Sequence, residues 1–175
     1  MKVGTRSLLF GVHQVFIHPW FVAAGWIKLY GWTWDLRIWA AFVVHDWGYW
    51  GKPNMDGPEG ETHPVLGADI MWLLFGNEWR RFALLHSRFY AKSWGVPPSK
   101  LCYADKMAIV MTPWWVYLPL ARLSGELNEY MTRGKDPHGK YAGEGQVSDN
   151  AKEWYLKVQS FVASWIDTHF QEASS

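Results

Sequence analysis

The sequence predicts an all-α protein, a single bundle of about seven helices in one domain that covers residues 1–175. Apolar residues recur at helical spacing through nearly the whole chain, and no segment shows a convincing alternation of apolar and polar residues. A length of 175 residues fits one domain, and 49% of the residues are hydrophobic whereas 19% are charged. These proportions exclude a disordered tail and are typical of a chain with a buried core.

Local signals bound the first helices. Pro19 suits the first turn of a helix, and Gly31 is expected to end the helix over residues 21–30. Asp35 is a capping residue for a helix over residues 36–47, whose apolar residues indicate burial on most sides.

Similar signals divide the rest of the chain. Thr62, Asn77 and Ser99 are capping residues that precede apolar stretches of helical period, and Gly76 is expected to end a helix. Pro113 suits the start of another helix. The remaining helices are expected over residues 63–75, 78–92, 100–111, 114–132 and 150–170, with a further helix or helical turn over residues 5–17 and a polar surface loop over residues 134–147.

Charge, cysteine content and hydropathy exclude several classes of function. The net charge is only +1, which disfavours a nucleic-acid binder that depends on a basic patch. The single cysteine, Cys102, excludes a disulfide framework and a cysteine-based zinc site, and its apolar neighbours indicate an inert thiol. A cytoplasmic location fits this composition. No segment reaches the roughly 20 apolar residues of a spanning helix, although 14 Trp leave peripheral membrane contact open.

A long polar loop is expected over residues 48–61, and loops of this length in compact domains are often functional. Asp56 and Glu61 are candidates for contacts around a site or with substrate hydroxyls. Glu59 is interpreted as a solvated acid, and Trp47 as a core residue.

Several other polar residues are interpreted as structural. Glu126 and Glu129 are expected to form surface ion pairs with Arg122 and Arg133, because each pair is spaced four residues apart on a helix. The histidines interpreted as ordinary core or surface residues are His13, His138 and His169.

The most informative feature is an adjacent histidine and aspartate, His45 and Asp46, directly after the apolar run at residues 40–44. A carboxylate at the end of a buried helix is costly unless a cation or several donors pair with it. A divalent metal ion would do so. Further nitrogen and oxygen ligands lie on separate expected helices, and a set without sulfur suits Mn, Fe, Co, Zn or Mg: His18, His63, His86 and Asp105.

The order of these residues resembles that of the HD-domain metal-dependent phosphohydrolase superfamily, whose pattern is H…HD…H…H…D on a bundle of helices. The matching segments are His-Pro-Trp-Phe-Val from His18, Ala-Ala-Phe-Val-Val-His-Asp-Trp-Gly around His45, His-Pro-Val-Leu-Gly-Ala from His63, Leu-Leu-His at His86 and Tyr-Ala-Asp-Lys around Asp105. The resemblance covers about residues 13–110. The helices within residues 113–170 would complete the bundle.

The resemblance implies a binuclear metal centre that activates water against a phosphate ester or anhydride. One ion would be held by His18, His45, Asp46 and Asp105, and a second by His63 and His86, with Asp46 bridging the two. Lys52 and Arg88 are candidates to bind the phosphate of a small substrate, most simply a nucleotide. The sequence departs from one subgroup of the family, because Tyr49 stands where that subgroup has a catalytic lysine, and from another, because Ser87 follows His86.

Two alternatives stay open at this point. Di-iron oxygenases of the same superfamily use the same ligand set for different chemistry, so the ligands alone do not separate the two reactions. A binding or membrane-associated module that uses its Trp-rich surface is the other alternative.

Overall fold

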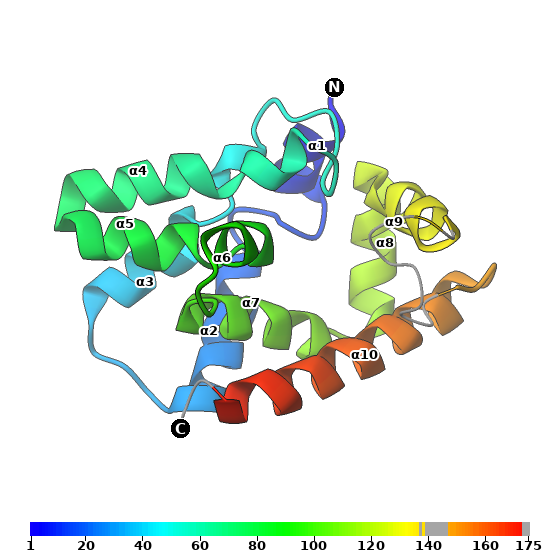
Figure 1. Ribbon diagram of the computed structural model, residues 1–175. Helices are drawn as coiled ribbons and strands as arrows, with labels where there is room; N and C mark the ends of the chain where they lie inside the picture. Colours follow the sequence, from blue (N-terminus) through cyan, green and yellow to red (C-terminus); the bar gives the residue numbers. More distant parts are fainter. Residues whose placement is uncertain (137, 139–146, 173–175) are drawn as a thin grey trace.

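A computed structural model describes residues 1–136, 138 and 147–172. Over these residues the chain is all-helical, with ten α-helices and two short 3₁₀ helices, η1 and η2 (Figure 1). In chain order they are α1 Val3–Phe10, α2 His18–Tyr30, α3 Leu36–Val44, η1 Trp47–Tyr49, η2 Gly60–Thr62, α4 Pro64–Phe75, α5 Asn77–Leu84, α6 Arg88–Trp94, α7 Lys100–Met111, α8 Trp114–Ser124, α9 Glu126–Gly134 and α10 Ala151–Glu172.

Most of the helices form two groups around the two largest of four apolar clusters among the described residues. Helix α2 packs along α7, and α4 and α5 form an antiparallel pair at one end of the molecule (Figure 1). The larger cluster joins α2, α3, α4, α5 and α7 through residues such as Val22, Phe42 and Met71. A second cluster joins α8, α9 and α10 through residues such as Tyr117 and Tyr155. Helix α10 runs along both α7 and α8, and so connects the two groups.

The all-α prediction is confirmed, but the described residues contain more helices than the expected seven. The helix expected over residues 78–92 is divided into α5 and α6, because Ser87 adopts an extended conformation and accepts a hydrogen bond from the Phe89 amide at 3.2 Å. The helix expected over residues 114–132 is divided at Gly125, whose φ of 88° ends α8. Residues 11–17 are outside the helix that was expected there, since α1 ends at Phe10.

The expected ends of helices are confirmed at three positions and corrected at one. Asp35 caps α3 by accepting a hydrogen bond from the Arg37 amide at 3.0 Å, and Gly31 and Gly76 have positive φ at the ends of α2 and α4. Thr62 belongs to η2, so that His63 precedes α4. Most of the loop expected over residues 134–147 lies outside the described residues. Within the described part of the chain, no helix has both the length and the apolar character needed to cross a bilayer.

Two glycines let the backbone segments around the His-Asp pair approach one another. A Cβ atom on Gly48 would overlap the carbonyl oxygen of His63, and one on Gly67 would overlap the carbonyl oxygen of Val44. Only glycine therefore fits this contact without a shift of the backbone. The close approach brings the start of α4 against the end of α3, which positions the site described next.

Candidate metal centre

Six buried histidine and aspartate side chains from five parts of the chain converge in the middle of the molecule. They lie at the start of α2, after α3, before α4, after α5 and within α7. The six are His18, His45, Asp46, His63, His86 and Asp105. They form two groups with close ligand atoms, one of four residues and one of three, and Asp46 belongs to both.

The first group surrounds one carboxylate oxygen of Asp46. Asp46 Oδ2 lies 3.3 Å from His18 Nε2 and 3.2 Å from His45 Nε2. Asp105 closes the group, with Oδ1 at 3.2 Å from His18 Nε2 and 3.9 Å from His45 Nε2. Two imidazole nitrogens and two carboxylate oxygens thus face one common point.

The second group surrounds the other carboxylate oxygen of Asp46. Asp46 Oδ1 lies 3.6 Å from His63 Nε2 and 3.4 Å from His86 Nε2. The two histidine Nε2 atoms are 3.1 Å apart. Each oxygen of Asp46 therefore faces a different group, which is the arrangement of a carboxylate that bridges two cations.

Three of the histidines are oriented by the same local hydrogen bond. The Nδ1 atom of each donates to the backbone carbonyl three residues earlier: His45 to Phe42 at 3.0 Å, His63 to Gly60 at 2.8 Å and His86 to Ala83 at 2.6 Å. Because a carbonyl oxygen only accepts, the proton of the neutral imidazole must be on Nδ1. The Nε2 atom then presents a lone pair to the centre, as a metal ligand requires.

The interatomic distances and the unsatisfied atoms fit metal ions. Nitrogen and oxygen atoms bonded to one ion at about 2.0–2.2 Å lie roughly 3.0–3.5 Å from one another, close to most of the separations above. His18 Nε2, His45 Nε2 and Asp46 Oδ2 are buried without a hydrogen-bond partner among the described residues. The lone pairs of His63 and His86 face each other at 3.1 Å, a contact that repels unless a cation lies beside both.

Electrostatics in the centre favour anionic aspartates. Burial raises the pKa of Asp46, but His45, His18 and His86 together lower it by more, so that it lies well below its usual range. For His45, burial lowers the pKa, and Asp46 and Asp105 raise it to about 10. Burial and the nearby His86 hold the pKa of His63 well below its usual range, which keeps its lone pair available. A metal ion at His45 would replace a proton there.

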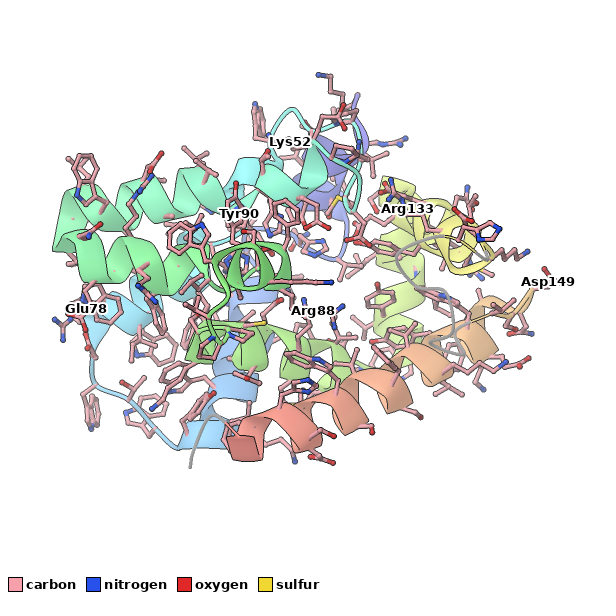
Figure 2. All side chains as sticks on the ribbon, viewed as in Figure 1. Lys52, Glu78, Arg88, Tyr90, Arg133 and Asp149 are labelled. Carbon is pink, nitrogen blue, oxygen red and sulfur yellow. The ribbon has the colours of Figure 1, made fainter. Side chains whose placement is uncertain are left out.

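A cavity of about 180 Å³ opens onto the centre, and that volume admits a substrate of several heavy atoms. Arg88 and Lys106 line it together with five of the six candidate ligands. Lys106 Nζ donates to Asp105 Oδ2 at 2.9 Å. Burial lowers the pKa of this amine, but Asp105 and Cys102 together raise it by more, and the group stays charged. Arg88 lies in the middle of the molecule on α6 (Figure 2).

Lys52 lies apart from Arg88, near the edge of the molecule (Figure 2). Its Nζ donates to the Thr62 hydroxyl oxygen at 2.6 Å. Of the two residues expected to bind phosphate, the structure therefore brings only Arg88 to the cavity. Lys106, which follows Asp105 directly, is the cation that the sequence analysis missed.

A buried ion pair beside the centre was not expected from the sequence. Glu126, expected at the surface with Arg122, is 0% exposed, and its Oε2 lies 3.1 Å from His13 Nδ1. The carboxylate also accepts from the Ser124 hydroxyl at 2.7 Å. Burial lowers the pKa of His13, but Glu126 raises it to about 9. His13 lines the cavity, so its protonated ring is a third positive group there, paired with the buried Glu126 carboxylate.

The loop over residues 48–61 meets the cavity as expected. Asp56 and Glu61 line it, and Glu59 is exposed and accepts from the Asn54 amide at 2.7 Å. The Tyr49 ring stacks on His63 with centroids 4.1 Å apart. Trp47 is 37% exposed, so its interpretation as a core residue is wrong.

The predicted ion pair of Glu129 with Arg133 is present, with Arg133 Nε 3.4 Å from Glu129 Oε1, but the Glu129 side chain is only 13% exposed and so is not at the surface. Glu129 also accepts from the backbone amides of Met55 and Asp56, which attaches the loop to α9. For Cys102, burial raises the pKa to about 11, in agreement with an inert thiol.

Comparisons with known proteins give no relative from which a role could be taken. No protein-family model matches the sequence, and no match was found among curated proteins or solved structures.

Proposed function

We propose that this chain is a metal-dependent phosphohydrolase of the HD type, with a binuclear centre that cleaves a small phosphate ester or anhydride. The observation that carries the proposal is the position of Asp46. Its Oδ2 faces the group of His18, His45 and Asp105, and its Oδ1 faces His63 and His86. The six residues also follow the H…HD…H…H…D order of that superfamily.

Two divalent ions held by these residues would neutralise phosphoryl oxygens and make a water molecule more acidic. The protein itself supplies the geometry. Asp46 fixes the spacing of the two groups, and the backbone carbonyls of Phe42, Gly60 and Ala83 fix the orientation of three imidazoles. Such support from outside the ligand set keeps a centre rigid.

The side chains that line the cavity favour hydrolysis of an anionic substrate. Arg88, Lys106 and His13 contribute positive charge next to the candidate ligands. A guanidinium can bind two phosphate oxygens at once, so we assign Arg88 to the binding of the substrate phosphate. Lys106 is held by Asp105 and would add to the local positive potential.

The test is phosphate release from protein stripped of metal and reloaded separately with Mn, Co, Mg, Zn or Fe. The substrates would include nucleotides, dinucleoside polyphosphates and simple phosphate monoesters. We expect metal-dependent release by the natural protein and by Glu59→Gln, a change at an exposed residue. Asp46→Asn, which keeps the side-chain size but removes the bridging carboxylate, should be inactive.

Two outcomes would contradict the proposal. Phosphate release by Asp46→Asn at the rate of the natural protein would show that the reaction does not need the centre. Absence of release with every metal, in protein that binds two ions, would contradict hydrolysis. Oxygen consumption by the iron-loaded protein would then identify the oxygenase alternative.

A further inference from the structure

The residues that line the cavity above the centre are of two chemical kinds. The polar ones include the candidate ligands, the cationic groups and the acids Asp56 and Glu61. One face of α10 contributes four large apolar or aromatic side chains, Trp154, Val158, Phe161 and Val162. We call these four residues the α10 wall. Their spacing of four, three and one residues places them along a single helix face.

The α10 wall is apolar in a place where the substrate must lie. Of the described α10 residues that line the cavity, none carries a charged, amide or hydroxyl group, and the one polar side-chain atom, Trp154 Nε1, is buried. Phe161 and Val158 are only partly buried. Apolar surface that faces a water-filled cavity is unfavourable until a ligand covers it, so a wall of this kind is typical of a binding site.

Hydrogen bonds hold the α10 wall in place. Gln159, between Val158 and Phe161 on α10, donates from Nε2 to the carbonyl oxygens of Ile109 and Thr112 at 3.1 and 2.9 Å. The hydroxyl of Tyr155 donates to the same two carbonyls, at 2.9 Å each. These contacts attach α10 to the corner between α7 and α8. The wall is therefore formed before a ligand binds, which lowers the entropic cost of binding.

Arg88 links the wall to the position assigned to the phosphate. Its guanidinium carbon lies 5.2 Å from the centre of the Trp165 ring. Trp165 is one helical turn beyond Phe161 on α10, so the phosphate-binding group lies beside the apolar wall. A substrate whose phosphate meets Arg88 and the centre would have its organic part within reach of Phe161.

We propose that the α10 wall is the subsite for the organic part of the substrate, and that this part is an apolar aliphatic or aromatic group. This inference rests on the proposed phosphohydrolase function and narrows it. A sugar-like group placed against the wall would leave hydroxyls without hydrogen-bond partners and would bind more weakly.

The test is calorimetric binding of three phosphonates to the full-length, manganese-loaded protein. Their carbon–phosphorus bond is not an ester, so hydrolysis does not interfere. Methylphosphonate reports the phosphate site alone, phenylphosphonate adds an apolar group and 2,3-dihydroxypropylphosphonate adds a polar one. We expect phenylphosphonate to bind about ten-fold or more tightly than either of the others.

Variants of α10 assign this preference to the wall. Phe161→Ser and Val158→Thr should each reduce the advantage of phenylphosphonate several-fold and leave the affinity for methylphosphonate unchanged. Val158→Thr keeps the shape of the side chain, so the test does not depend on a variant that leaves a cavity. Leu156→Ser is the matched control, because Leu156 is on the same helix and is 45% exposed; it should bind like the natural protein.

The outcomes separate this inference from the proposed function. Equal binding of the three phosphonates, or a preference that Phe161→Ser and Val158→Thr leave intact, would overturn the inference while the phosphohydrolase proposal stands. Binding of none of the three would overturn both. Tighter binding of the dihydroxypropyl compound would also refute the inference, and would indicate that the acids of the cavity hold the organic group.

Discussion

Single substitutions at the centre should remove metal ions in a pattern set by the two groups that share Asp46. His86 contributes to only one group, so we expect His86→Asn to retain one ion per chain and the natural protein to retain two. Asp46 contributes to both groups, so Asp46→Asn should retain none after desalting. Glu59→Gln, at an exposed acid that bonds Asn54, should keep two.

The same pattern should appear in thermal stability. An ion that binds only the native chain adds about 2.7 kcal/mol when its concentration is 100 times its Kd. For a chain of this size, 1 kcal/mol shifts Tm by about 2–4 °C. Each site should therefore raise Tm by about 5–11 °C, so that metal shifts the natural protein by twice as much as His86→Asn and leaves Asp46→Asn unchanged.

Elemental analysis of desalted protein would give the number of ions, and circular dichroism melts with and without metal would give Tm. Retention of two ions by His86→Asn would refute the assignment of His86 as a ligand. A full metal-dependent shift in Asp46→Asn would refute the shared carboxylate, and with it the two-group arrangement.

Three further predictions concern the surroundings of the centre. Because burial lowers the pKa of His13 and Glu126 raises it to about 9 from its ordinary value of 6.5, their pair should stabilise the fold fully below pH 6.5 and progressively less as pH rises through 9. Between pH 6.5 and 9 the free energy of unfolding of the metal-free protein, measured with urea, should fall by about 3 kcal/mol more than that of Glu126→Gln, because His45 titrates in both proteins and cancels in the comparison. Gly48→Ala, whose Cβ would overlap the His63 carbonyl, should lower the free energy of unfolding by about 1–3 kcal/mol; an unchanged urea midpoint would contradict this. Arg88→Gln should reduce kcat/KM for phosphate release about 10- to 100-fold at unchanged metal content, and equal kinetics would exclude its contact with the phosphate.

Much of the fold and the set of converging residues could be predicted from local sequence signals. Asp35 and Gly31 act through contacts within a few residues, so their roles were readable from the chain. The histidines and aspartates that meet in the structure were recognisable because each lies in or next to an apolar helical segment, in the order of a known pattern.

The remaining features depend on contacts between distant parts of the chain. Glu126 has Arg122 one turn away, the usual signal of a surface ion pair, but its partner is His13, 113 residues earlier. Nothing local distinguishes the two possibilities, because burial comes from the packing of α1 against α8. The break between α5 and α6 was also missed, since apolar residues keep the helical period across it and only Ser87 marks the new start.

The placement of the histidines at helix ends explains why the centre calls for cations from outside the chain. His45, His63 and His86 each follow a helical turn, and each donates the Nδ1 proton to the backbone carbonyl three residues earlier in that turn, at Phe42, Gly60 and Ala83. This leaves three Nε2 lone pairs facing the carboxylates of Asp46 and Asp105. Lys106 offsets part of this charge, at Asp105. The local hydrogen bonds that orient the imidazoles therefore also leave the centre electron-rich. Two metal ions would bind nitrogen and oxygen atoms whose positions the protein has already fixed.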